Sequence, residues 1–193
     1  MTQLILGLAL LMGPHCVRFI DAGFRDRAVA RMGEGAWKGL YSLISLAGLA
    51  LIAMGFGAAR ADSPVLWVSP AAAKHAAAAL MLLSCVLLAA AFVPGNHFKA
   101  RVGHPMVLGV KTWAFAHLLA NGRLVDVLLF GVFLAWAVAL FIALRRADRV
   151  AGKTYPAAGV AEDLISVVAG GAVFAGIAFW GHQALFGVSP FTL

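Results

Sequence analysis

The sequence predicts an all-α, polytopic membrane protein, a bundle of about six transmembrane helices. Of its 193 residues, 63% are hydrophobic and only 12% are charged, about half the charged share of an average soluble domain. The apolar residues form blocks that approach the roughly 20 helical residues needed to cross a bilayer. These blocks are continuous rather than alternating, which favours helices over a membrane β-barrel. We expect one transmembrane domain spanning residues 1–193.

Six apolar blocks are expected to form the helices. They cover residues 4–19, 37–59, 71–92, 105–120, 124–144 and 164–186. The first block lacks a preceding basic segment and a small-residue cleavage site, so we expect a retained helix rather than a signal peptide. The fourth block is short for a full crossing. Since Asn121-Gly122 is typical of a tight turn, the fourth and fifth blocks should form a helical hairpin.

The distribution of basic residues predicts the orientation. If all six blocks cross, the connections on one side carry eleven Lys and Arg residues, namely Arg18, Arg25, Arg27, Arg31, Lys38, Lys99, Arg101, Arg145, Arg146, Arg149 and Lys153. The opposite connections carry only Arg60, Lys74 and Arg123. The positive-inside rule then places the basic side in the cytoplasm and both termini in the periplasm of a bacterial inner membrane.

Several classes of function are poorly supported. The net charge of +7 suits anionic lipid headgroups, and no interleaving of basic and aromatic residues indicates nucleic-acid binding. Cys16 and Cys85 lie within apolar blocks, where thiols behave as small hydrophobic groups. All eight acidic residues fall in connections or at block ends. A hydrolytic triad at membrane depth, or a relay of paired carboxylates, is therefore not expected.

Six histidines are the main chemical resource, and they are His15, His75, His97, His104, His117 and His182. Ionisable residues within a membrane span usually face the bundle interior and mark function. Imidazoles bind transition metals, and two facing imidazoles can hold a haem. No HxxxH or HExxH motif occurs, so a shared ligand set must come from different helices.

Simpler roles compete with ligation at most of these positions. His75 and His182 lie near block ends, which is typical of hydrogen-bonded interfacial residues. His97 and His104 lie in a connection, where solvated or helix-capping roles are common. Lys111, inside the fourth block, can extend its ammonium group to the interface. His15 and His117 are the strongest candidates for function.

Three segments resemble the NnrU family of membrane proteins. They are "GEGAWKGLYSLISLAGL" (residues 33–49), "FVPGNHFKARVGHPMVLGVKTWAFAHLLANG" (residues 92–122) and "HQALFGVSP" (residues 182–190). The resemblance extends along essentially the whole chain. It implies a link to nitrite and nitric oxide metabolism in denitrification.

The NnrU family is also related to zeta-carotene isomerase, a membrane enzyme that holds haem b between two histidines. The resemblance implies that His15, His104 and His117 match its histidine motifs, with His15 and His117 as the axial ligands. Lys111 and Trp113, in the same segment, are further candidates for cofactor contact. The isomerase has a cysteine three residues before the second ligand, used in a redox-linked ligand switch. Ala114 stands at that position here.

Depth within the membrane leaves the pairing of ligands open. At 1.5 Å per residue, His15 should lie about 6 Å from the cytoplasmic face and His117 about 18 Å from it. An oblique or later start of the fourth helix would reduce the difference. Alternatively, His117 pairs with His75 or His182, which the topology puts at closer depth.

The sequence therefore predicts a haem-b-binding membrane protein of nitrogen-oxide metabolism, which senses or handles nitric oxide or exchanges electrons with a redox partner. The alternative is a haem-dependent cis–trans isomerase of a hydrophobic polyene. A cofactor-free membrane scaffold is a third possibility. "GHPMVLG" (residues 103–109) also weakly resembles the "RHPxYxG" motif of isoprenylcysteine-type methyltransferases. It lacks the Arg and Tyr of that motif, and Glu162-Asp163 is a poor match for the later acidic pair.

Overall fold

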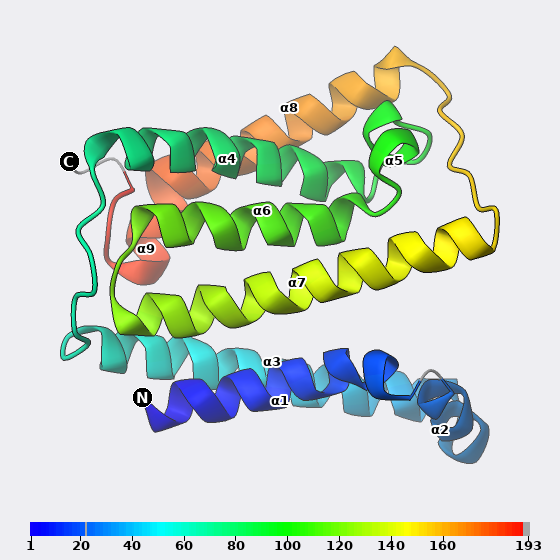
Figure 1. Cartoon of the computed structure of the whole chain (residues 1–193), viewed down its shortest axis with the longest axis horizontal. Coiled ribbons are helices and arrows are strands. Elements are labelled where there is room, and N and C mark those ends of the chain that lie inside the picture. Colours follow the sequence, from blue (N-terminus) through cyan, green and yellow to red (C-terminus); the bar gives the residue numbers. More distant parts are fainter. Residues whose placement is uncertain (22, 191–193) are drawn as a thin grey trace. The chain divides into compact units, whose positions relative to one another are not determined.

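The computed structural model describes residues 1–21 and 23–190, and it is helical apart from the connections (Figure 1). The helices are α1 (Thr2–Ile20), α2 (Phe24–Met32), α3 (Glu34–Arg60), α4 (Ala71–Ala90), α5 (His97–Val102), α6 (Pro105–Ala120), α7 (Leu124–Val150), α8 (Val160–Gly176), the π-helical turn η1 (Ile177–Gly181) and α9 (His182–Phe186). The all-α fold predicted from the apolar blocks is confirmed.

Four helical segments among the described residues are long and apolar enough to cross a membrane. They are α3, α4, α7 and the continuous stretch Val160–Phe186, which joins α8, η1 and α9. The two remaining apolar helices, α1 and α6, are shorter. Each of the six expected blocks therefore corresponds to an apolar helix, as in a multi-pass membrane protein.

Two helices extend by a full turn or more beyond the apolar blocks that predict them. Helix α7 continues to Val150 and α8 begins at Val160. The additional residues of α7 include good helix formers, and the last turn contains Arg149, whose charge is favourable near a helix C-terminus. The first turn of α8 contains Glu162 and Asp163, whose charges are favourable near a helix N-terminus. The charged side chains lower the hydropathy of these turns, but they also stabilise the helical conformation there.

The chain forms two compact units. The first comprises Met1–Val65 and Arg123–Val132, and the second comprises Leu66–Gly122 and the residues from Phe133 onward. Helix α7 contributes its first part to one unit and the rest to the other. Whether the two units act as one domain, as the sequence predicts, stays a prediction.

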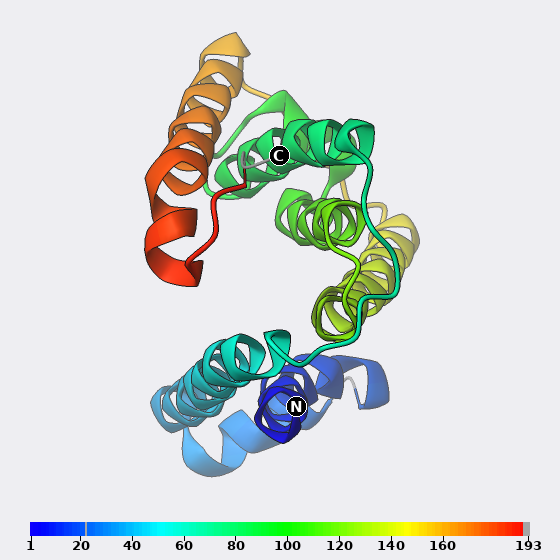
Figure 2. The same cartoon turned by 90° about the vertical axis from the view of Figure 1, so that its left-hand side faces the viewer.

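In the first unit, α1 and α3 pack side by side through glycines (Figures 1 and 2). A Cβ on Gly55 would lie 2.3 Å from the backbone nitrogen of Leu4, and one on Gly48 would lie 2.7 Å from that of Leu11. The backbones therefore approach too closely for any side chain at these positions. Such contact between small residues is how helices associate in lipid, where apolar burial gives little net attraction.

In the second unit, α4 packs against both α6 and α8. The hydroxyl of Ser84, fully buried on α4, donates to the carbonyl of Gly109 on α6 over 2.8 Å. On the α8 side, a Cβ on Gly170 would lie 2.5 Å from the Cα of Val86. A buried hydrogen bond and close glycine contacts thus hold α4 between its two neighbours.

The hairpin expected from Asn121-Gly122 is confirmed. Along α6 and the second-unit part of α7, the Nζ of Lys111 lies 5.1 Å from the ring centre of Phe141, and the rings of Trp113 and Phe133 are 5.3 Å apart. At the turn, the carbonyl of Gly122 accepts hydrogen bonds from the backbone of Leu66 and Trp67.

The α1–α3 contact predicts opposite effects for two glycines on the same helix. Replacing Gly55 with Ala should lower the free energy of unfolding by about 1–3 kcal/mol, because the new methyl group collides with the α1 backbone. Gly57→Ala is the matched control, since a Cβ there meets nothing within 4 Å and removing a helical glycine stabilises by about 0.4–1 kcal/mol. Thermal unfolding in detergent measures both variants. Equal midpoints would contradict the close approach of α1 and α3.

Candidate functional site

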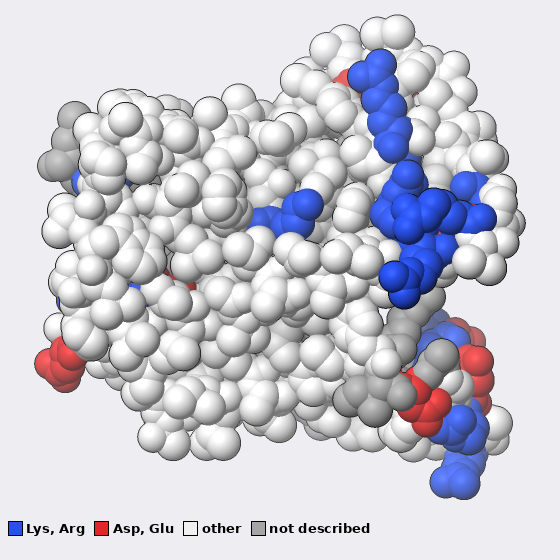
Figure 3. All heavy atoms as spheres, viewed as in Figure 1, with Lys and Arg blue, Asp and Glu red and all other residues white. Residues whose placement is uncertain are grey.

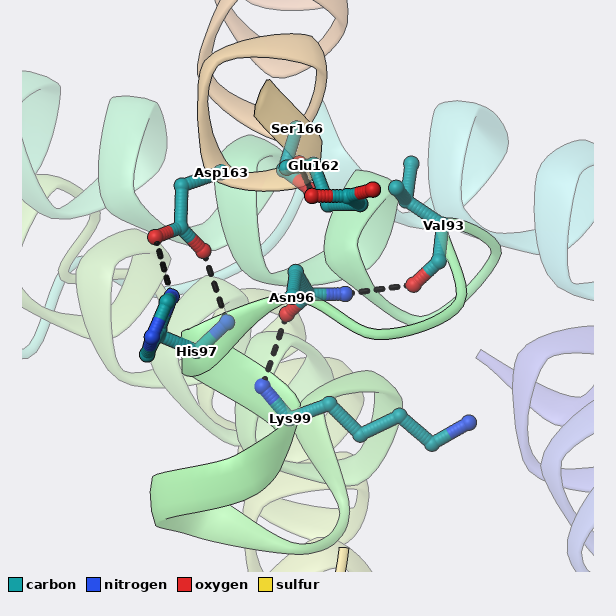
Figure 4. Close-up of polar contacts among 7 residues, drawn as sticks. All are labelled: Val93, Asn96, His97, Lys99, Glu162, Asp163 and Ser166. Carbon is teal, nitrogen blue, oxygen red and sulfur yellow. Dashed lines mark hydrogen bonds and ion pairs between the residues drawn. The ribbon is translucent and has the colours of Figure 1, made fainter. Parts of the chain in front are cut away.

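The connection between α4 and α6 is built around a buried asparagine. Asn96 is fully buried and caps α5, where its Oδ1 accepts from the backbone nitrogen of Lys99 over 2.7 Å (Figure 4). Its Nδ2 donates to the carbonyls of Ala90 and Val93. The amide therefore satisfies carbonyls at the end of α4 and fixes the start of α5 at once.

His97 follows Asn96 and is held by a carboxylate on α8. The backbone nitrogen of His97 donates to Oδ1 of Asp163 over 2.7 Å, and its ring Nδ1 lies 2.8 Å from Oδ2 (Figure 4). Both oxygens of Asp163 are thus engaged by one residue. His97 and Asp163, together with Phe98 and Arg101, line a cavity of about 350 Å³.

A second histidine–carboxylate pair lies between the start of α6 and the end of α7. The Nε2 of His104 lies 2.7 Å from Oδ2 of Asp148, and the Tyr155 hydroxyl donates to both oxygens of Asp148 over 3.2 Å. The Asp148 side chain is only 9% exposed and that of His104 only 17%. Together the three residues form a mostly buried polar cluster.

The carboxylate partners of these histidines could not be found from the sequence. A solvated or capping role was expected for His97 and His104, but each ring bonds a carboxylate, Asp163 or Asp148, that lies 66 or 44 residues away. His104 occupies the N-cap position of α6 without capping it through its side chain. Their tertiary pairing depends on the extra turns of α7 and α8, which the apolar blocks did not include.

Three of the histidines in apolar helices, His15, His117 and His182, share a different arrangement. The Nδ1 atoms of His15, His117 and His182 lie 2.6, 2.9 and 2.7 Å from the carbonyls of Leu11, Trp113 and Val188. A carbonyl only accepts, so in each pair Nδ1 is the donor. The lone pair of the neutral ring is then on Nε2, the arrangement that second-shell carbonyls impose on metal-binding histidines.

His15 and His117 also have matching aromatic neighbours. The ring of His15 lies 5.1 Å from that of Tyr41 on α3, at 50° between the planes. The ring of His117 lies 5.1 Å from that of Trp113, at 52°. Trp113 in turn packs edge-on against Phe133. Each imidazole is therefore held by a hydrogen bond to the carbonyl of the residue four positions earlier and by contact with an aromatic ring.

The other candidate residues on α4 and α6 have separate surroundings. The ammonium group of Lys111 lies over the ring of Phe141, so this cation is accommodated by an aromatic face. His75 is exposed in the second turn of α4. Ala114, at the position of the isomerase cysteine, is fully buried.

A comparison with protein families decides the identity. A family model described as "NnrU protein" matches residues 3–190. The chain belongs to the NnrU family. Comparisons with curated proteins and with solved structures found no match. The resemblance carried by the three sequence segments is thereby confirmed.

In this NnrU-family protein, the structure groups the candidate ligands by unit. His117 and His182 lie in the second unit. His15 lies in the first unit, and its pairing with His117 stays a prediction. Among residues 1–21 and 23–190, no cluster of three or more His, Cys, Asp or Glu side chains is arranged to hold a metal ion.

The Asp148 cluster predicts a specific loss of stability. Asp148→Asn should lower the free energy of unfolding by about 1.5–3 kcal/mol, because it weakens charge-assisted bonds in a mostly buried cluster. Asp26→Asn is the control, because Asp26 is exposed on α2 and its bond to Arg25 is a surface pair worth at most about 1 kcal/mol. Thermal unfolding in detergent compares them, and an equally small shift for both would show that the cluster contributes little.

Proposed function

We propose that this NnrU-family membrane protein binds haem b, with Nε2 of His117 and Nε2 of His15 as the axial ligands. The observation that carries the proposal is the shared arrangement of the two imidazoles. Each donates from Nδ1 to the carbonyl four residues earlier on a short apolar helix, and each lies beside an aromatic ring. The family resemblance supplies the same pair independently.

The residues around His117 suit a flat, apolar cofactor. Ala114 and Ala116 are fully buried, so small side chains precede the imidazole on α6. The carbonyl of Trp113 orients the ring and makes Nε2 more basic, as second-shell acceptors do in haem and metal proteins. When bound, haem b supplies one-electron chemistry and an iron that can bind nitric oxide. The protein supplies ligand orientation and exclusion of water.

His182 is the rival for the second axial position. It lies in the same unit as His117, it has the same Nδ1-to-carbonyl bond, and it directly follows the π-helical turn η1. Such turns are frequent at functional sites because the extra residue rotates the side chains that follow. The different membrane depths expected for His15 and His117 also favour His182. That expectation assumed that the first helix ends near Phe19 and that the fourth begins at Pro105, and α1 ends at Ile20 and α6 begins at Pro105.

The role in nitrogen-oxide metabolism follows from the family and the haem together. A haem held in an apolar bundle suits either sensing of nitric oxide or electron exchange with a redox partner. The isomerase alternative is weakened by Ala114, because no thiol stands three residues before His117 to take part in a ligand switch. A carotenoid-producing host expressing this protein should therefore keep its ratio of cis to trans polyenes. A changed ratio would favour the isomerase.

Absorption spectroscopy of the purified protein tests the ligands. The full-length chain in detergent should show a Soret band, and His117→Ala should lose most of it because one axial bond to the iron is removed. His15→Ala should have the same effect. His75→Ala should leave the band unchanged, since His75 is exposed, and loss of the band in this variant would instead make His75 the second ligand.

The same series separates the rival pairings. If His182→Ala abolishes the band while His15→Ala retains it, the second ligand is His182 and the proposed pair is wrong. If the wild-type protein is folded but colourless after expression with ample haem, the haem proposal as a whole is wrong.

A further inference from the structure

We propose that the cavity between α5 and the first turn of α8 binds a phosphate group, and that its occupant is the headgroup of an anionic phospholipid. The cavity has a volume of about 350 Å³ and is lined by His97, Phe98, Arg101 and Asp163. It lies in the second unit, and nothing in the proposal depends on haem.

Arg101 supplies the recognition of the anion. Its side chain is exposed, and it makes no ion pair or hydrogen bond with another residue in the described part of the chain. A planar guanidinium donates two parallel hydrogen bonds to a phosphate, which makes it the best-suited protein group for this purpose. An unpartnered guanidinium at a cavity wall therefore indicates an anionic ligand.

The carboxylate that lines the same cavity is hydrogen-bonded through both oxygens, which reduces its repulsion of an anionic ligand. Asp163 accepts from both the backbone nitrogen and the ring Nδ1 of His97, so its oxygens are already occupied by donors. The same bonds fix the His97 ring, whose Nε2 accepts from a headgroup hydroxyl when neutral and donates to a phosphate oxygen when protonated. The bonds between His97 and Asp163 thus fix the polar wall of the cavity before a ligand binds.

The surrounding charge attracts anions to this end of the second unit. Figure 3 shows Lys and Arg side chains gathered at the end of the molecule that carries α5. The basic residues on α5 and the last turns of α7 are Lys99, Arg101, Arg145, Arg146 and Arg149. The positive-inside rule assigns this end to the cytoplasmic leaflet, where anionic lipids collect basic segments.

The rigidity of α5 limits the cost of binding. Buried Asn96 ties the start of this helix to the end of α4, and the backbone of Ala158 donates to the carbonyl of Gly95 over 2.7 Å. The cavity walls are therefore held in place before the ligand arrives, which reduces the entropy lost on binding.

Neighbouring apolar side chains favour a lipid over a soluble phosphate. Val160, Leu164 and Ile165, on the turns of α8 around Asp163, are 76%, 62% and 55% exposed. Phe98 adds an apolar wall to the cavity itself. A phospholipid can place its phosphate at Arg101 and its acyl chains along these residues, whereas a free phosphate gains nothing from them.

Native mass spectrometry of the full chain in detergent, with added phosphatidylglycerol or phosphatidylcholine, tests the proposal. Phosphatidylglycerol should bind more tightly than phosphatidylcholine, and Arg101→Gln should weaken its binding by roughly tenfold, as expected for loss of a charge-assisted bond. Arg146→Gln and Lys99→Gln are the matched controls. They remove the same charge at the same end, but neither residue lines the cavity, and Figure 4 shows Lys99 extending away from His97 and Asp163.

Three results would overturn the inference. Equal weakening by all three substitutions would mean that general charge attraction, not the cavity, binds the lipid. Equal affinity for the two lipids would mean that no anionic group is recognised. Inorganic phosphate that displaces phosphatidylglycerol at similar concentration would reassign the site to a soluble phosphate. Unchanged thermal unfolding of Arg101→Gln ensures that a loss of binding is not a loss of fold.

Discussion

Hydrogen bonding of polar side chains to partners within the protein is the constraint on which most of the second unit's polar structure depends. Hydrocarbon offers no hydrogen-bond partner, so a polar side chain in a membrane helix must find one in the protein. Ser84 finds the carbonyl of Gly109, and Asn96 finds carbonyls at the end of α4. The histidines obey the same rule. His15, His117 and His182 bond to carbonyls, whereas His97 and His104, at the polar end of the second unit, bond to carboxylates.

This division of the histidines has chemical consequences. A carbonyl partner fixes the position of the proton without adding charge, so His15, His117 and His182 are suited to bind a metal through Nε2 in an apolar setting. A carboxylate partner adds charge and holds two elements together, as Asp148 and Asp163 do. The first group is therefore the one that we propose for cofactor binding, whereas the second group links α5, α6, α7 and α8.

The sequence predicted the six apolar helices and the α6–α7 hairpin, because long apolar blocks and Asn121-Gly122 are local signals. It predicted the family because three segments carry the resemblance. It did not predict the His97–Asp163 and His104–Asp148 pairs. Each pair joins residues far apart in the chain. Each carboxylate also lies in a helix turn whose charged residues lower its hydropathy, so the apolar blocks did not include that turn. The glycine contacts were also missed, since Gly55 and Gly57 look alike in the sequence and differ only in what lies opposite.

The account depends most on two imidazoles that share one iron. Electron paramagnetic resonance of the oxidised, haem-loaded protein tests this directly, because the spin state of ferric haem reports its axial ligands. Two imidazole ligands predict a low-spin signal that is lost in His117→Ala. A high-spin signal from the wild-type protein, typical of iron with one strong axial ligand, would contradict the proposed pair.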